Sequence, residues 1–176
     1  MTEHRRRIDT VLEPDYLEGL ADLDLNEVRR RRDTAEDVEA QISYYRRLLH
    51  GRMDLLDFEM RRRSGEEQRT ILEALPEILA NGMILGSEPN LKHIETMPPL
   101  PSMTGRRLID KIMDDGVLAS LPELTDDEIT EAIERLRDVE TQLSGQRRRL
   151  HQVIDVLQDE MVSRYRTQQG EASVSG

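Results

Sequence analysis

The amino-acid sequence predicts an all-α protein built on two long helices. Only 3% of its 176 residues are aromatic, whereas 35% are Asp, Glu, Lys or Arg, a balance typical of long amphipathic helices. Residues 20–63 and 121–164 share 17 identities over 44 positions at a constant offset of 101, where random composition would give roughly three. The chain therefore contains an internal duplication, and we expect one long helix in each copy.

Both copies begin with a helix-capping pattern, Asp24-x-x-Glu27 in the first and Thr125-x-x-Glu128 in the second. These patterns predict helices over residues 25–63 and 126–167, each about 60 Å long at about 1.5 Å per residue. In both helices apolar residues recur three or four positions apart, as a helix–helix seam requires. The seam residues are Val38, Ile42, Leu49, Met53, Leu56 and Met60, matched by Val139, Leu143, Leu150, Ile154, Leu157 and Met161. We expect the helices to pair as an antiparallel coiled coil, with parallel packing as the open alternative.

The segment between the two long helices has a different character. Residues 66–81 read as a short helix interrupted by Pro76, and residues 82–104 are rich in Pro and Gly. A second short helix is expected around residues 106–115. This segment is long enough to return the chain for an antiparallel pairing.

We therefore predict a single helical domain over residues 16–167, in which residues 64–125 form a Pro- and Gly-rich helical connector. Residues 1–15 are expected to be a flexible N-terminal tail. Residues 168–176, rich in Gln, Gly, Ser and Glu, are expected to be a disordered tail.

The charge and composition exclude several classes of function. A net charge of −11 argues against binding of duplex DNA, which requires a basic face, and favours a basic protein as partner. The chain has no Cys, so it has neither disulfides nor a thiolate metal site. No apolar run approaches the roughly 18 residues of a transmembrane helix, and the N-terminus is not an apolar signal core. We expect a soluble, cytoplasmic protein that does not bind membranes.

Five polar residues recur in both copies, beside the apolar seam. They are Glu39, Ser43, Arg46, His50 and Asp54 in the first copy, and Glu140, Ser144, Arg147, His151 and Asp155 in the second. At about 100° per residue, each set shares one helix face about 80° wide. Because this face adjoins the seam, we expect the two sets to line a groove between the helices. Folding does not require the same polar residues twice, so the duplicated set is the candidate binding site.

The residue types in this set suit a guanine nucleotide with twofold symmetry. Arginine can donate two hydrogen bonds to guanine O6 and N7 or stack on the base. Carboxylates accept hydrogen bonds from guanine N1–H and N2–H, and both serine and arginine donate to phosphate.

The duplicated pattern E-x-x-x-S-x-x-R-x-x-x-H-x-x-x-D resembles the signature of the actinobacterial RsiG family of cyclic di-GMP-responsive anti-sigma factors. Four of the five motif positions match in each copy, and the departures are His50 and His151, where the family pattern has Gln. The resemblance implies that the ten motif residues bind cyclic di-GMP, two molecules per chain, as an intercalated dimer across the helices. It also implies that the loaded protein sequesters a WhiG-type sporulation sigma factor and represses transcription. Neutral His keeps one donor and one acceptor, so this contact can become pH dependent.

Two other hypotheses remain open. The first is a helical scaffold or dimerisation module without ligand, in which the charged residues form ordinary intrahelical pairs worth about 0.2–0.5 kcal/mol each. The second is a metal site between helices made by His50, Asp54, His151 and Asp155, spaced i, i+4 in each copy. A metal site leaves both motif arginines unexplained, so we expect no metal. The sequence contains no nucleophile–base constellation and no Gly-rich phosphate loop, and we therefore expect no enzyme activity.

Overall fold

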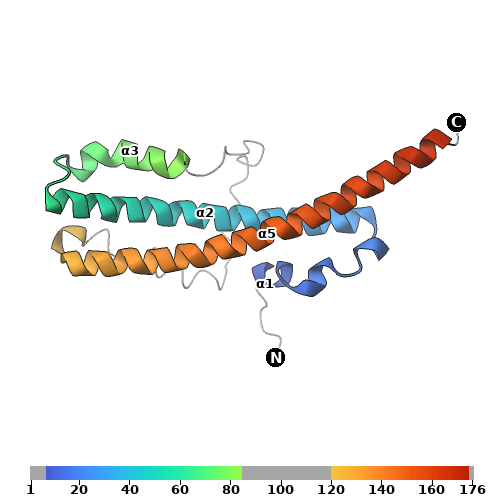
Figure 1. Cartoon of the computed structure of the whole chain (residues 1–176), viewed down its shortest axis with the longest axis horizontal. Helices are drawn as coiled ribbons and strands as arrows, with labels where there is room; N and C mark the ends of the chain where they lie inside the picture. Colours follow the sequence, from blue (N-terminus) through green and yellow to red (C-terminus); the bar gives the residue numbers. More distant parts are fainter. Residues whose placement is uncertain (1–6, 85–119, 175–176) are drawn as a thin grey trace, which may run out of the picture. The chain divides into compact units, whose positions relative to one another are not determined.

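The structure of the chain is all-α. It is a computed structural model that describes residues 7–84 and 120–174, and no strand occurs in these two ranges. The elements are α1 (Arg7–Val11), η1 (Pro14–Leu17), η2 (Leu20–Asp22), α2 (Leu25–Ser64), α3 (Ile71–Ile84), η4 (Leu121–Glu123) and α5 (Asp126–Val174), where η marks a short 3-10 helix (Figure 1). The predicted fold class is confirmed. The short helix predicted around residues 106–115 lies outside the described residues.

Both long helices begin where their capping patterns predict. The Asp24 side chain accepts a hydrogen bond from the Glu27 amide at 2.8 Å. This bond satisfies one backbone N–H of the first turn of α2 that has no partner within the helix. At the start of α5 the capping is reciprocal. The Glu128 amide donates to Thr125 Oγ1 at 3.3 Å, and the Thr125 amide donates to the Glu128 carboxylate at 2.8 Å.

The far ends of the helices follow the prediction less closely. Helix α2 ends at Ser64 because Gly65 adopts the left-handed region, with φ of 83°, and Arg61 to Arg63 in the last turn complement the helix dipole. Helix α5 continues to Val174, so most of the predicted disordered tail at 168–176 is helical. Helix α3 begins at Ile71 and continues through Pro76, whereas the sequence predicted a helix from residue 66 interrupted there.

The chain forms two units, and each long helix contributes a segment to both. The first unit is Met1–Ile42 with Gly145–Gly176, and the second unit is Ser43–Ser144. The seam residues are largely buried in their units, apart from the half-buried Met53, Met60 and Ile154. The apolar periodicity of the sequence therefore identified the packed faces of both helices.

In the first unit the two helix segments run antiparallel. Arg32, early in α2, donates to Gln158, late in α5, at 3.3 Å, whereas Glu39 further along α2 accepts from Arg147 at 2.8 Å. The buried core of this unit includes Val28, Ala35, Val38, Leu150, Val153, Leu157 and Met161. The antiparallel orientation is the one that we expected.

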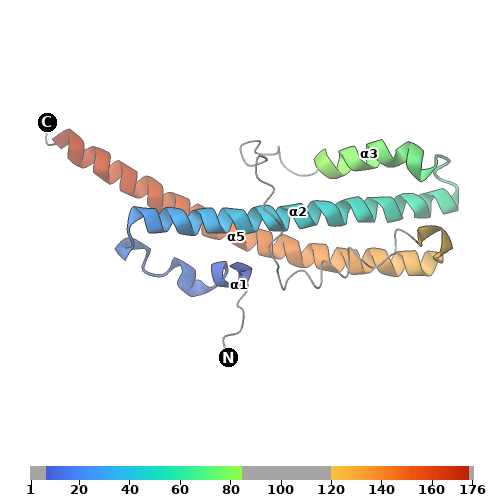
Figure 2. The same ribbon diagram turned by 180° about the vertical axis from the view of Figure 1, so that it is seen from behind.

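The second unit is also antiparallel and is covered on one side by α3. Arg46 pairs with Glu140 at 2.8 Å, and Arg63 at the end of α2 pairs with Asp126 at the start of α5 at 2.9 Å. Helix α3 lies along α2 (Figure 2) and packs through a cluster of buried residues, with partly buried residues around it. This cluster consists of Phe58, Ala74 and Ile78, flanked by Leu55 and Ile71.

The N-terminal segment differs from the flexible tail that the sequence predicted for residues 1–15. Residues 7–11 form α1, whose Ile8 and Val11 are buried. Downstream, Tyr16 donates its hydroxyl hydrogen bond to the Arg31 carbonyl at 2.8 Å. Two apolar residues one helical turn apart are enough to fix this segment on the first unit, although its average composition is polar.

Candidate functional site

The ten motif residues are divided between the two units, and each unit holds residues of both copies of the motif. The first unit holds Glu39, Arg147, His151 and Asp155, which we call the first cluster. The second unit holds the other six, which we call the second cluster: Ser43, Arg46, His50, Asp54, Glu140 and Ser144. Because the segments are antiparallel, the glutamate that begins one copy meets the arginine and histidine further along the other copy.

In the second cluster, several donors converge on one oxygen of Glu140. Arg46 donates to Glu140 Oε1 from Nε at 3.0 Å and from Nη2 at 2.8 Å. Ser144 donates to the same oxygen at 2.7 Å, and His50 Nε2 lies 3.2 Å from it. One carboxylate of α5 thus holds two motif side chains of α2 and one of its own helix.

These contacts set the protonation state of Glu140. Burial raises the pKa of its carboxyl, but the hydrogen bonds from Ser144, Arg46 and His50 outweigh burial and lower the pKa to about 2. The carboxylate therefore stays ionised at neutral pH. Its side chain is 20% exposed and that of Arg46 is 23% exposed, so the pair is accessible from solvent.

The first cluster repeats this arrangement with the helices exchanged. Arg147 Nε, on α5, donates to Glu39 Oε1, on α2, at 2.8 Å. His151 Nε2 lies 3.4 Å from the same oxygen. The motif arginine and histidine of one helix therefore meet the motif glutamate of the other in both units, a crossing that spacing along one helix cannot reveal.

The aspartates at the end of the motif differ between the clusters. Asp155 is exposed, whereas Asp54 Oδ2 is buried and has no hydrogen-bond partner among the described residues. Burial is the main cause that raises the pKa of the Asp54 carboxyl, and His50 opposes it. A buried acceptor without a partner is costly, and this cost distinguishes Asp54 from its exposed counterpart Asp155.

The four residues of the metal-site alternative are divided between the two units. The two His–Asp pairs of the motif belong to different units, His50 with Asp54 in the second and His151 with Asp155 in the first. Within residues 7–84 and 120–174, no group of three or more metal-ligating side chains lies close enough to hold an ion.

A second set of duplicated residues was not predicted as functional from the sequence. Glu59 and Arg63 of α2 correspond to Glu160 and Arg164 of α5 at the same offset of 101. Each arginine binds backbone carbonyls in the short turn that precedes the opposite long helix. The signal was present among the identities of the duplication, but no spacing along one helix connects these arginines to backbone carbonyls of another segment.

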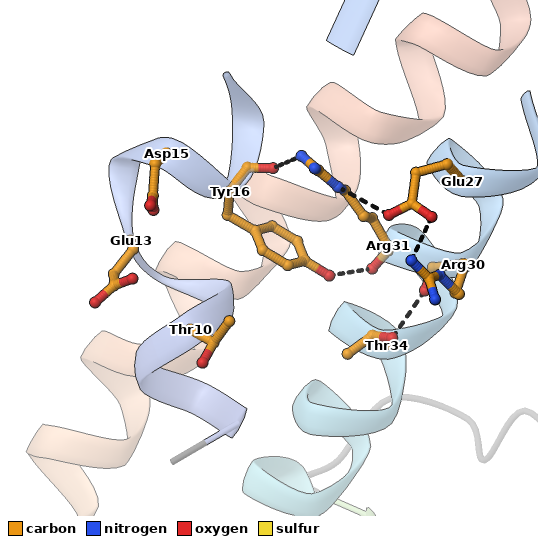
Figure 3. A pocket seen from close by; sticks show the side chains of 8 residues that line it. All are labelled: Thr10, Glu13, Asp15, Tyr16, Glu27, Arg30, Arg31 and Thr34. Carbon is orange, nitrogen blue, oxygen red and sulfur yellow. Dashed lines mark hydrogen bonds and ion pairs between the residues drawn. The ribbon is translucent and has the colours of Figure 1, made fainter. Parts of the chain in front are cut away.

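A hollow of about 410 Å³ lies between the N-terminal segment and α2 in the first unit (Figure 3). Its walls include Tyr16, Glu27 and Arg31. Arg31 Nη1 donates to the Tyr16 carbonyl at 2.6 Å and forms an ion pair with Glu27 at 3.4 Å. Arg30 and Arg31 of this hollow are therefore both paired with Glu27, and none of the ten motif residues lines it.

The fold and the two clusters define a class of protein: a pair of antiparallel helical segments in each unit, joined by a duplicated polar motif. The family follows from a comparison with known proteins. The chain matches the RsiG-like family over residues 14–79 and 115–175, which is most of its length, and it belongs to this family. Membership suggests an anti-sigma factor role, with a sigma factor as partner.

No curated protein matches the chain. In the described parts of the chain, no helix has both the length and the apolar character needed to span a bilayer.

Proposed function

We propose that the protein is an anti-sigma factor that binds two molecules of cyclic di-GMP through its two clusters and then captures a WhiG-type sporulation sigma factor. The observation that carries this proposal is the crossed pairing of Arg46 with Glu140 and of Arg147 with Glu39. Each unit thereby holds a guanidinium and carboxylates at one accessible place. These groups match the acceptors and donors of guanine.

The chemistry of binding is an exchange of partners. In the structure, Arg46 donates two hydrogen bonds to Glu140. A guanine base that accepts from Arg46 through O6 and N7 presents N1–H and N2–H to a carboxylate on the other side of the base. The ion pair is then replaced by two sets of charge-assisted hydrogen bonds, which are stronger than bonds between neutral groups.

Asp54 supports the same proposal from a different direction. Its Oδ2 is buried without a partner, and the raised pKa of its carboxyl reflects that burial. A guanine N–H or a ribose hydroxyl at this position would satisfy the acceptor. Ligand binding would therefore relieve a cost that the unliganded protein carries.

Gating of the partner follows from linkage. A ligand that engages both helices of a unit favours one arrangement of them, and a partner that prefers this arrangement binds more tightly when ligand is present. The coupling is reciprocal, so the sigma factor must increase the affinity of the protein for cyclic di-GMP by the same factor. Because sigma factors act on RNA polymerase, we place this capture, and the repression of transcription that results, in the cytoplasm.

Isothermal titration calorimetry with cyclic di-GMP tests the ligand directly. We expect saturation at two molecules per chain. Cyclic di-AMP is the matched control, because adenine lacks O6 and the N1–H donor and should give no comparable heat. A flat cyclic di-GMP titration would contradict the ligand hypothesis. A helical scaffold would then explain the duplicated motif better.

A further inference from the structure

The second unit contains a second contact between its helices, at the end of α2. Arg63 Nη1 donates to the Leu124 carbonyl at 2.6 Å, and Nη2 donates to the Leu121 carbonyl at 2.8 Å. Its Nε donates to Glu59 at 2.8 Å, and Nη1 also reaches Asp126 at 2.9 Å. One guanidinium thus binds its own helix and the turn that precedes α5.

The first unit repeats the bonds to the two carbonyls and to the glutamate, whereas Asp126 has no counterpart there because the equivalent residue is Leu25. Arg164 Nη1 donates to the Leu23 carbonyl at 2.6 Å, and Nη2 donates to the Leu20 carbonyl at 2.5 Å. Its Nε donates to Glu160 at 2.7 Å. We call these two sets the arginine clamps, the Arg63 clamp in the second unit and the Arg164 clamp in the first.

The acceptors make each clamp a rigid contact. Both pairs of carbonyls belong to a short turn, η2 with the residue after it in the first unit and η4 with the residue after it in the second. Backbone acceptors cannot rotate away as side chains can, and the planar guanidinium fork fixes two of them at once. The Arg63 and Arg164 side chains are only 19% and 20% exposed, so water competes weakly for these bonds.

The spacing links each clamp to the cluster of its unit. On α2, Arg63 lies 17 residues after Arg46. On the opposite segment, Leu124 lies 16 residues before Glu140. Both intervals correspond to about 25 Å of helix at about 1.5 Å per residue. The first unit has the same intervals, from Arg147 to Arg164 and from Leu23 to Glu39. A slip by one residue would turn the motif side chain by about 100° and break the pair.

We propose that Arg63 and Arg164 are positioning residues, and that each clamp holds the helix segments of its unit in the register at which the motif arginine of one helix meets the motif glutamate of the other. The consequence for cyclic di-GMP rests on the proposed function. The effect on the register does not, and it can be measured without ligand.

The Glu140 carboxyl is the reporter of register in the second unit. Its pKa is held at about 2, below the ordinary 4.5, partly by hydrogen bonds from Arg46 and His50 across the helix pair. We expect Arg63→Met to raise the pKa of Glu140 by at least one unit, as followed by carbon-detected NMR titration of the carboxyl. An unchanged pKa in a folded Arg63→Met protein overturns the proposal.

Arg62→Met is the matched control. Arg62 donates to the same Glu59, at 2.8 Å, from the same turn of the helix, but none of its hydrogen bonds in the described residues reaches α5. The Arg62→Met substitution therefore removes the same charge and leaves the Arg63 clamp intact, so the pKa of Glu140 should not change. If Arg62→Met raises the pKa as much as Arg63→Met does, loss of charge explains the effect and the clamp proposal fails.

Arg63→Lys decides the matter if Arg63→Met does not fold. It keeps the charge and the aliphatic stem but cannot bind two carbonyls as a planar fork. We expect a smaller rise in the pKa of Glu140, with circular dichroism confirming that helicity is retained. No rise in this folded variant would again overturn the proposal.

Calorimetry with cyclic di-GMP then tests the consequence. We expect Arg63→Met to weaken one of the two binding events at least tenfold, and Arg164→Met to weaken the other. Equal weakening of both events by either variant contradicts a clamp that serves its own unit. If the wild-type titration is flat, the proposed function fails, whereas the clamp proposal is still judged by the pKa of Glu140.

Discussion

Arg46 of α2 donates two hydrogen bonds to a single oxygen of Glu140 on α5, at 3.0 and 2.8 Å. The same crossing joins Arg147 to Glu39 in the first unit. Each motif arginine is therefore held by the carboxylate that the other copy of the motif supplies. A ligand for these clusters must compete with an ion pair, and it finds the arginine already oriented.

Replacement of either motif arginine should nearly abolish ligand binding at the cluster of its own unit and spare the fold. Arg46→Ala and Arg147→Ala each lose charge-assisted bonds to nucleotide that are worth about 1.5–3 kcal/mol. Both side chains lie at the accessible edge of the helix pair, at 23% and 31% exposure, so helicity should be unchanged. Calorimetry and circular dichroism together check the two parts of this prediction.

Leu49→Ala should have the opposite effect, a loss of stability without a loss of ligand binding. Leu49 is 1% exposed in the core, and its truncation should cost about 2–5 kcal/mol of the free energy of unfolding. The melting temperature should fall while cyclic di-GMP still binds below it. Early melting with normal binding in the arginine variants would mean that the binding face and the packed face are reversed.

Asp54 and Asp155 should respond differently to neutralisation. Burial raises the pKa of the Asp54 carboxyl, so the charged form destabilises the fold at neutral pH, and Asp54→Asn should raise the melting temperature or leave it unchanged. The same change should weaken cyclic di-GMP binding, because the acceptor Oδ2 loses its charge. Asp155→Asn, at an exposed position, should leave stability unchanged. A lower melting temperature for Asp54→Asn would show that its carboxylate already has a stabilising partner.

Acid should weaken the second unit through Glu140. Its folded pKa of about 2 lies below the ordinary value of 4.5, so its contribution to stability is complete above pH 4.5 and is lost as the pH falls toward 2. Glu59, with a pKa of about 2, loses its contribution in the same window. Glu140→Gln should therefore flatten only part of the decline in melting temperature below a pH of about 5. Glu134→Gln, at an exposed position on the same helix, is the control that should leave the decline intact.

The sequence predicted the parts of the fold that depend on local chemistry. Capping at Asp24 and Thr125 set the starts of both long helices, and the apolar periodicity identified their packed faces. The prediction from sequence failed where a few buried contacts outweigh the average composition of a segment. Ile8 and Val11 fix the N-terminal segment against a polar average.

For the candidate site, the sequence identified which residues recur but not how they meet. The periodicity placed Glu39 and Arg46 on one face of one helix, whereas the structure pairs each with a residue of the other helix. This crossing depends on the register of two segments far apart in the chain. The clamps were missed for the same reason, since Arg63 and Arg164 act on carbonyls that no spacing rule connects to them.

Ligand-gated capture is tested most directly by measuring how the purified protein binds a WhiG-type sigma factor with and without cyclic di-GMP. We predict that ligand tightens capture of the sigma factor, and that the sigma factor tightens ligand binding by the same factor. The Arg46→Ala, Arg147→Ala double variant should lose both effects. Capture that is equally strong without ligand and in the double variant would contradict this prediction, because the two clusters would then have no part in holding the partner.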